Sequence, residues 1–364
     1  MPKTYRAVAI GHTDHGGYGH GIHLPYGGLD NVEFTAVADP DEAGRAQAQA
    51  ETGAPRAYAD FADMLRSEEP DIVSICPRWT QRRSDMLLAA LEVGAHVYCE
   101  KPLVSSLQEG DTIVARAREL GRKIAVAHQA VYLPRVQYVK EILQQGRIGE
   151  VQAIYAHGKQ DRRGGGEDML VLGTHLFNMM RFFAGDVSWI SAHVTMDGHE
   201  LEPGDVHEAT EPVGLVAGDC VDSYYAFESG IAGFFDSRKD QAGARGTPYG
   251  MDIVGSEGRI SMRGGAAEGL MIYPHSLYAP AESAQRWEPL VEAPQSKMHD
   301  GNQLAIIDLI AAVEEDRKPL SADTDALAAL EMILGTYASQ ISGTRVEVPI
   351  TDRVHPLTRW ASET

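Results

Sequence analysis

The sequence predicts an α/β protein with an amino-terminal doubly wound parallel sheet, followed by an α+β domain with a large, open, mainly antiparallel sheet. Three observations support this prediction. Short apolar runs alternate with helix-like segments over the first 127 residues. A turn rich in glycine follows the first of these runs. Farther along the chain, four β-type runs lie close together, as in an antiparallel sheet with one open face. We therefore expect domains at residues 1–127 and 128–364.

The first predicted strand, Tyr5–Ile10, leads into the glycine-rich turn, and the second, Val32–Ala38, ends at Asp39. A strand, a glycine-rich turn, a helix, a second strand and an acid form the layout of a dinucleotide-binding unit. In such a unit the helix amino terminus holds the pyrophosphate and the acid binds the ribose hydroxyls. The pattern Gly-x-Gly-x-x-Gly is not matched, but Asp39 follows Gly19 by 20 residues, which fits the motif. A purely structural glycine turn is the alternative.

NAD is the cofactor that this arrangement favours, because Asp39 would repel the 2′-phosphate of NADP. The alternation continues with predicted strands at 56–58, 71–76, 95–99 and 123–127, and with helices at 60–67, 84–93 and 107–120. The candidate cofactor-binding residues lie in the glycine-rich turn and after these strands: Gly11, His12, Gly16, Tyr18, Gly19, Asp39, Pro77, Arg78, Trp79, Glu100, Lys101 and His128.

Lys101 follows the predicted strand at 95–99 and precedes Pro102. The carboxyl ends of strands in an open α/β sheet are where such sheets bind ligands. The proline stops the strand and fixes the turn. A lysine there can hydrogen-bond to or deprotonate a substrate hydroxyl. The alternative is an ordinary strand end with an exposed lysine.

The second domain is predicted to contain a helix at 134–145, strands at 150–157, 188–196, 220–228, 230–236 and 251–260, and helices at 302–315 and 324–340. The acidic stretch 197–218 is predicted to be a loop. The segment 168–183 reads as one helix on which Asp168, His175 and Asn178 share a face. With Gly173 between them, this polar stripe predicts a site, and a core histidine with satisfied hydrogen bonds is the alternative for His175.

Composition excludes several classes of partner. The chain has 364 residues and a formal net charge of −20, which argues against nucleic acid and anionic membranes. We expect no membrane span and no signal peptide. Three unpatterned cysteines indicate reduced thiols and a cytoplasmic protein. No histidine or cysteine spacing matches a metal site, so no metal is expected.

A basic segment precedes the helix at 168–183. Its charged residues, Lys159, Asp161, Arg162 and Arg163, are candidate substrate-binding residues together with Asn178. Arginine suits bidentate binding of a carboxylate, sulfonate or phosphate, so an anionic sugar is one predicted substrate. A solvated loop with ordinary surface charges is the alternative.

Taken together, five features resemble the Gfo/Idh/MocA family over nearly the whole chain: the glycine-rich turn, Asp39, Glu100-Lys101-Pro102, Gly173-Thr174-His175 and the final segment Asp352-Arg353-Val354-His355-Pro356-Leu357. The resemblance implies a Rossmann domain and an open-sheet domain with oligomer contacts, in a homodimer or homotetramer. It also implies hydride exchange between NAD(P) and a sugar or cyclitol hydroxyl. Lys101 matches the family's catalytic lysine, and His175 matches its catalytic histidine.

Three departures from the family pattern leave the mechanism open. The family's aspartates on the site helix are replaced by Val171 and Asn178, and Asp168 is a candidate catalytic substitute. Pro77 is followed by Arg-Trp-Thr-Gln instead of Asn-x-x-His, and the first glycine turn is longer. A sugar dehydrogenase is the first hypothesis. An NAD-dependent redox glycosidase, with no net oxidation, is the second, and a cofactor-bound regulatory or binding protein is the third.

Overall fold

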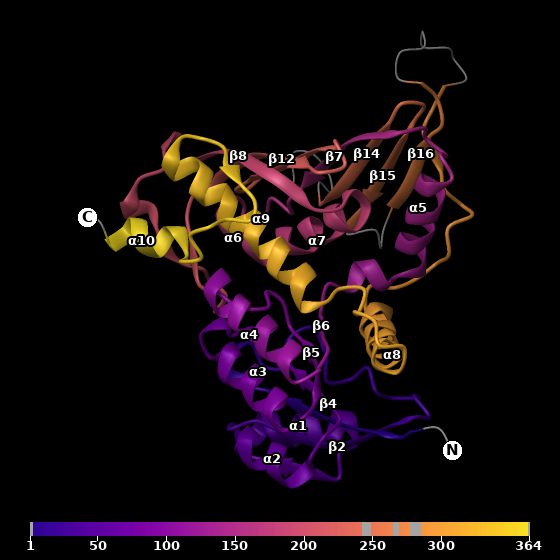
Figure 1. Cartoon of the computed structure of the whole chain (residues 1–364), viewed down its shortest axis with the longest axis vertical. Coiled ribbons are helices and arrows are strands. Elements are labelled where there is room, and N and C mark those ends of the chain that lie inside the picture. Colours follow the sequence, from indigo (N-terminus) through magenta and orange to yellow (C-terminus); the bar gives the residue numbers. More distant parts are fainter. Residues whose placement is uncertain (1–2, 242–248, 265–268, 277–284, 363–364) are drawn as a thin grey trace. The chain divides into compact units, whose positions relative to one another are not determined.

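The computed structural model describes residues 3–241, 249–264, 269–276 and 285–362 (Figure 1). These residues form two compact units. Unit 1 comprises the chain up to Ala127 together with Ala209–Gly214 and Asn302–Leu327, and unit 2 comprises His128–Glu208, Leu215–Gly301 and the chain from Ala328 on. The domain boundary expected after residue 127 assigned the segments 209–214 and 302–327 to the second domain. They belong to unit 1 through specific contacts, among them the Arg78–Glu211 ion pair and the hydrogen bond from Tyr98 to Asn302.

Unit 1 is built on a sheet of six strands in the order β3-β2-β1-β4-β5-β6, and every neighbouring pair is parallel. The strands are β1 (Tyr5–Ile10), β2 (Val32–Ala38), β3 (Arg56–Tyr58), β4 (Ile72–Ile75), β5 (His96–Cys99) and β6 (Ile124–Val126). The strand order is that of a Rossmann fold and confirms the predicted doubly wound sheet. Because both faces are covered, β4, β5 and β6 are buried along their whole length.

Three helices of unit 1 begin at side chains that accept a hydrogen bond from the first turn. Asp41, Asp60 and Ser106 cap α1 (Glu42–Thr52), α2 (Phe61–Glu68) and α4 (Leu107–Glu119) in this way. The connections after β4 contain the 3₁₀ turn η2 (Thr80–Arg82) and α3 (Arg83–Glu92). The helix α8 (Asp300–Glu314) and the first residues of α9 (Asp323–Ser342) complete the helical set.

The expected helix between the first two strands is absent. Residues 11–31, all of them described, contain the 3₁₀ turn η1 (Thr13–His15), an isolated bridge between His12 and Gly17, and a series of tight turns. The backbone φ is positive at four glycines of this turn, Gly16, Gly17, Gly19 and Gly21. A right-handed helix needs negative φ, so no regular helix forms here. The helix amino terminus that the sequence predicted for the pyrophosphate is therefore not present, and the glycine-rich turn takes its place.

Unit 2 contains a ten-stranded sheet in the order β17-β16-β15-β14-β7-β13-β12-β8-β18, with β9 paired to β8. The longer strands are β7 (Val151–His157), β8 (Val187–Met196), β12 (Cys220–Phe227), β13 (Ala232–Arg238), β14 (Gly250–Gly255), β15 (Arg259–Arg263) and β16 (Gly269–Tyr273). The shorter ones are β9 (His199–Glu200), β17 (Glu288–Pro289) and β18 (Val346–Glu347). Among the described strands of this sheet, only β7 and β13 pair in parallel, which confirms the mainly antiparallel sheet.

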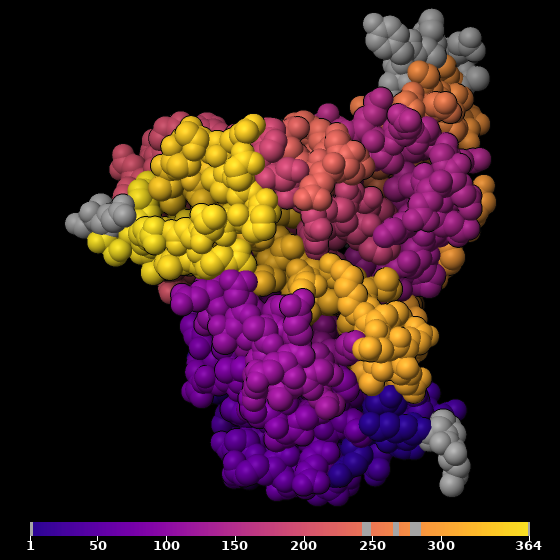
Figure 2. Space-filling view, in the orientation of Figure 1, coloured from indigo at the N-terminus to yellow at the C-terminus, as the bar shows by residue number. Residues whose placement is uncertain are grey.

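One face of this sheet is covered by helices. The helices α6 (Gly166–Val171) and α7 (Gly173–Ala184) contact it, and Thr336 of α9 exchanges a hydrogen bond with Tyr225. The strict alternation of burial along β12 and β13 follows from one covered and one open face. The helices α5 (Pro134–Gln144) and α10 (Pro356–Ser362) complete the unit. The last described residues of the chain, which include α10, are yellow in Figure 2.

Three local predictions for unit 2 were wrong. The strand expected at 251–260 is a hairpin of β14 and β15, because the chain turns at Ser256-Glu257-Gly258. The expected loop at 197–218 contains β9 and a two-stranded ribbon of β10 (His207–Glu208) and β11 (Leu215–Val216). The helix expected at 168–183 is interrupted at Leu172, so Asp168 and His175 lie on different helices.

Two further structural expectations can be compared with the described part of the chain. None of its helices is long and apolar enough to cross a membrane. Within the described ranges, no group of three or more histidine, cysteine, aspartate or glutamate side chains is arranged to hold a metal ion.

Candidate active site

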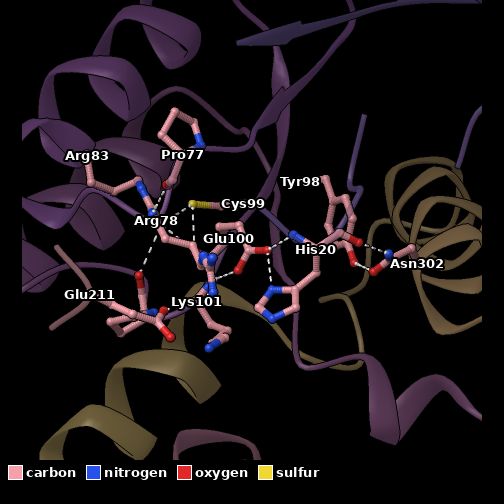
Figure 3. Close-up of polar contacts among 11 residues, drawn as sticks. His20, Pro77, Arg78, Arg83, Tyr98, Cys99, Glu100, Lys101, Glu211 and Asn302 are labelled. Carbon is pink, nitrogen blue, oxygen red and sulfur yellow. Dashed lines mark hydrogen bonds and ion pairs between the residues drawn. The ribbon is translucent and has the colours of Figure 1, made fainter. Parts of the chain in front are cut away.

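Lys101 lies two residues after the end of β5 and is 1% exposed. The guanidinium of Arg83, from α3, is fully buried and contacts the backbone on both sides of Lys101 (Figure 3). It donates to the carbonyl oxygens of Glu100 and Pro102, the latter at 3.1 Å, and its second nitrogen donates to the carbonyl of Pro77. The ends of β4 and β5 are thereby tied together. A single buried cation therefore sets the path of the chain on both sides of Lys101.

The carboxylate of Glu100 is fully buried beside Lys101. It accepts hydrogen bonds from the backbone nitrogen of Lys101 at 3.0 Å, and from the backbone nitrogen and Nδ1 of His20 at 2.7 and 2.6 Å. Burial alone would raise the pKa of Glu100, but the hydrogen bonds and charge of His20 lower it to about 2. Glu100 is thus a buried anion that binds the glycine-rich turn to the end of β5.

Close packing explains three glycines of the turn. A Cβ at Gly19 would lie 2.5 Å from both the Cys76 carbonyl oxygen and Oε1 of Glu100. At Gly16 it would lie 2.9 Å from the backbone nitrogen of Arg78, and at Gly11 it would meet the ring of Tyr18 at 2.2 Å. The predicted cofactor residues Gly11, Gly16, Tyr18 and Gly19 are thus packed against one another or against the strand ends.

A cavity of about 190 Å³ opens at the carboxyl ends of β1 and β2. It is lined by Gly11, His12, Ala38, Asp39, Pro40, Ala59, Asp60, Phe61, Trp79, Arg82 and Met86. The Asp39 carboxylate accepts hydrogen bonds from the backbone nitrogen and hydroxyl of Thr13, at 3.2 and 2.9 Å, and from the backbone of Asp41. His15 stacks on Trp79 with ring centroids 3.8 Å apart. An acid beside an aromatic-lined cavity at this sheet edge fits the adenosine half of a dinucleotide.

The residues after β4 take structural roles that the sequence did not indicate. The Pro77 carbonyl accepts from Arg83, and Nη1 of Arg78 donates to Glu211 at 2.9 Å. Arg78 thus secures the segment 209–214 to unit 1. Trp79 is the member of this group that lines the cavity.

In unit 2, the structure brings His175 and His128 together. Their rings meet edge to face with centroids 5.5 Å apart, and Nε2 of His128 lies 3.0 Å from the hydroxyl of Thr174. His128 is 1% exposed, whereas His175 is half-buried at the start of α7. Asn178, one turn along α7, is 3% exposed. The ring of His128 therefore orients His175. Asp168 lies on a different helix and does not share a polar face with His175.

Asp168 is fully buried and connects three elements of unit 2. Its Oδ2 accepts from the hydroxyl of Ser237 at 2.6 Å and from the backbone nitrogen of Gln160 at 3.0 Å. Its Oδ1 meets no hydrogen-bond donor among the described residues. Burial raises the pKa of this carboxyl. These contacts favour a structural role for Asp168 over a role as the acceptor of a substrate proton.

The triple glycine before α6 is also explained by packing. A Cβ at Gly164 would lie 2.3 Å from the Arg238 backbone, and one at Gly166 would lie 2.1 Å from the Ala217 carbonyl. The run therefore lets α6 approach the sheet closely.

The positive charge of the basic segment 159–163 is partly neutralised by an acidic residue of the same segment. Arg163 pairs with Asp161 at 3.0 Å, and Lys159 lies 3.5 Å from the same carboxylate. Burial would raise the pKa of Asp161, but the hydrogen bonds from Arg163 lower it to about 2. Arg162 is exposed. The segment therefore presents less net positive charge than its sequence suggests.

Sequence reasoning missed Arg83, His20 and Asn302. Arg83 carried a weak signal, a cation at the start of an apolar helix, but nothing showed that it would turn inward. His20 is one of several histidines in the glycine-rich turn, and only the geometry distinguishes it by its contact with Glu100. Asn302 donates to the His20 carbonyl at 3.1 Å and accepts from Tyr98 at 2.8 Å.

Comparison with known protein families agrees with this geometry. Residues 10–128 match the model of an oxidoreductase family with an NAD-binding Rossmann fold, Gfo/Idh/MocA. Residues 136–261 match the C-terminal domain of the same family. The chain belongs to the Gfo/Idh/MocA oxidoreductase family. It therefore contains an NAD-binding Rossmann domain, and the family resemblance seen in the sequence is confirmed.

Similar proteins include sugar and cyclitol dehydrogenases. The scyllo-inositol 2-dehydrogenase (NAD⁺) of Bacillus subtilis is 24% identical over 350 residues, which cover 92% of this chain and 94% of that protein. Dehydrogenase aclE of Aspergillus oryzae is 27% identical over 183 residues, 46% of this chain and only 50% of that protein. The solved structure of a levoglucosan dehydrogenase, in complex with NADH and levoglucosan, matches with a TM-score of 0.76 at 18% identity, over 95% of this chain and 100% of that one.

Proposed function

We propose that this protein is an NAD-dependent dehydrogenase that oxidises a secondary hydroxyl of a sugar, cyclitol or glycoside. The observation that carries the proposal is the rigid placement of Lys101 at the end of β5, between carbonyl groups that Arg83 holds. A lysine at this edge of a Rossmann sheet can receive the proton of a bound alcohol. NAD supplies the hydride acceptor when it is bound.

Acid–base chemistry in this proposal belongs to Lys101 and His175. Lys101 is buried and would hold the hydroxyl and take up its proton. His175, half-buried against His128, is proposed as the second acid–base group because it matches the family's catalytic histidine. Asp168 is left out of this pair because its carboxyl is buried against Ser237 and Gln160. Asp39 and the cavity beside Trp79 would bind the adenosine part of NAD.

The substrate in this proposal is a neutral polyol or glycoside. Arg163 and Lys159, the cations that suggested an anionic sugar, share Asp161 as a counter-ion. A substrate carboxylate would have to compete with that fixed partner. A paired test compares a glucoside with the matching glucuronide: similar kcat/KM values support a neutral substrate, and a strong preference for the glucuronide that Arg163→Ala removes would support an anionic one.

The function is tested by incubating the purified protein with NAD⁺ and a panel of polyols and glycosides, including scyllo-inositol and levoglucosan. NADH formation with at least one of them, lost by at least about 100-fold in Lys101→Met, is the expected result. Hydrolysis of a glycoside without accumulation of NADH would instead establish the redox glycosidase. Tight NAD binding with no turnover of any compound would indicate a binding protein.

We also propose that the open face of the unit 2 sheet binds a second copy of the chain. Tyr155 stacks on Phe234 with centroids 4.7 Å apart, and Trp189 and Tyr224 extend the same aromatic row across β8 and β12. A shallow cavity of about 480 Å³ lies over this row. An exposed aromatic surface on an open sheet is typical of a protein interface. The three free cysteines fit the reducing cytoplasm, where we propose that the enzyme works.

A further inference from the structure

A buried base has to return its proton to solvent in every catalytic cycle. Lys101 is 1% exposed, so its amine has little direct contact with water. The imidazole of His20, by contrast, is 34% exposed. Both residues are bonded to one carboxylate, that of Glu100: His20 through Nδ1 at 2.6 Å and Lys101 through its backbone nitrogen at 3.0 Å. In Figure 3 the ammonium end of Lys101 and the ring of His20 extend from Glu100 in the same direction.

The pair formed by His20 and Glu100 fixes the imidazole in one tautomer. A buried carboxylate that stays ionised accepts hydrogen bonds only, so Nδ1 of His20 carries the proton. Nε2 is then the atom that can accept a second proton. A histidine held by a carboxylate in this way is a common arrangement for proton transfer.

The backbone of His20 is fixed as firmly as its ring. Its nitrogen donates to Glu100 at 2.7 Å, and its carbonyl accepts from Asn302 at 3.1 Å. Asn302 is itself held by Tyr98 at 2.8 Å. Gly19 allows this approach, since any larger residue would collide with Glu100. A histidine needed only to fill surface space would not require contacts on both sides of its peptide and on its ring.

We propose that His20, held by Glu100, passes the substrate proton from Lys101 to solvent. This inference rests on the proposed dehydrogenase function. The amine of Lys101 would take up the hydroxyl proton as the alcohol becomes a carbonyl. NAD⁺, when bound, would supply the acceptor for the hydride that leaves the broken carbon–hydrogen bond. The Lys101 ammonium then gives one proton to Nε2 of His20, while Nδ1–H stays bonded to Glu100. The imidazolium releases the Nε2 proton to water, which restores both residues.

His20→Gln tests the relay, because the amide can still donate to Glu100 but cannot take up a proton. His207→Gln, at an exposed histidine of unit 2, is the matched control. With the panel sugar that gives the highest rate, we expect His20→Gln to bind NAD⁺ within about twofold of wild type and to lose at least about tenfold in kcat. Added imidazole buffer should restore most of that loss. An unchanged kcat, or a loss that imidazole does not restore, would overturn the relay.

A second measurement separates this inference from the proposed function. Nitrogen-15 NMR of histidine-labelled protein reports the tautomer of His20, assigned from the missing signal in His20→Gln. We expect a proton on Nδ1 in the neutral imidazole, and a shift of that signal in Glu100→Gln. A neutral His20 protonated on Nε2 would refute the pairing whether or not a substrate is found. Absence of NADH formation with every panel compound, with the Nδ1 tautomer present, would refute the proposed dehydrogenase instead.

Discussion

Arg83 holds the backbone on both sides of Lys101, through the carbonyl oxygens of Glu100 and Pro102. The guanidinium has no exposed surface, and it reaches the end of β4 through Pro77 as well. A buried cation is costly unless hydrogen bonds compensate for the lost hydration. Here the compensation comes from carbonyl groups and not from a carboxylate. The position of the proposed base is therefore tied to the stability of unit 1.

Arg83→Lys should weaken both the fold and the site. An ammonium on a flexible stem cannot reach carbonyls in three directions at once, so at least one buried carbonyl loses its donor. We expect a loss of at least about 2 kcal/mol in the free energy of unfolding, measured with urea, and a lower kcat at saturating NAD⁺. Arg66→Lys, at an exposed residue of α2, should change neither. Wild-type stability in Arg83→Lys would contradict the clamp.

Gly19→Ala and Gly17→Ala form a matched pair. Both glycines have positive φ, 59° and 56°, so alanine costs a similar backbone strain of about 1 kcal/mol at each. A Cβ at Gly17 meets nothing within 4 Å, whereas one at Gly19 would lie 2.5 Å from Oε1 of Glu100. We expect Gly17→Ala to keep near-normal activity and Gly19→Ala to lose at least about tenfold in kcat. Equal effects of the two substitutions on kcat and on thermal unfolding would show that the approach to Glu100 is unimportant.

Much of the fold was predictable because apolar runs alternate regularly with helix-like segments along the sequence. The strands of unit 1 are short apolar runs between helices, and their predicted ranges agree with the structure to within one residue at each end. The glycine-rich turn was different. The sequence predicted that it leads into a helix, whereas four glycines with positive φ in close succession leave no regular helix between β1 and β2.

The site was predictable only in part, for a similar reason. Lys101, Asp39 and His175 follow motifs, so sequence alone singled them out. The roles of Arg83 and Asp168 depend on which way each side chain turns, and both turn inward to partners that the local sequence pattern does not indicate. The helix is interrupted at Leu172, which places Asp168 and His175 on different helices. The pattern of apolar residues does not reveal this interruption.

Asp39→Asn should change cofactor preference. Asp39 directly follows β2 and lines the proposed adenosine cavity, where its charge disfavours a 2′-phosphate. Asparagine keeps an oxygen that can accept from the hydroxyl of Thr13 but removes the charge. We expect the ratio of the NADP⁺ and NAD⁺ dissociation constants, measured by calorimetry, to fall at least about tenfold. The exposed Asp30→Asn is the control, and an unchanged ratio in Asp39→Asn would exclude Asp39 from cofactor discrimination.

Tyr155→Glu should disrupt the proposed assembly. Tyr155 is 38% exposed and stacks on Phe234 in the middle of the open sheet face. A charge buried at the centre of an interface is strongly unfavourable. We expect light scattering to show an oligomer for wild type and a smaller species for Tyr155→Glu. Glu257→Gln, in the β14–β15 turn, should behave as wild type, and identical masses for all three proteins would argue against this face as the contact.

The stability of the protein should depend on Glu100 at acidic pH. Its pKa is about 2 in the folded chain against 4.5 for an ordinary glutamate, so the folded state favours the ionised form. The stabilisation is therefore complete above about pH 4.5 and is lost as the pH falls from 4.5 toward 2. We expect the stability difference between wild type and Glu100→Gln to shrink across that window, by on the order of 3 kcal/mol. Urea unfolding at several pH values measures it, with the exposed Glu119→Gln as control. A difference that stays constant from pH 6 to pH 3 would mean that the buried carboxylate is not stabilised as an anion, and the proton relay through His20 would then lose its fixed tautomer.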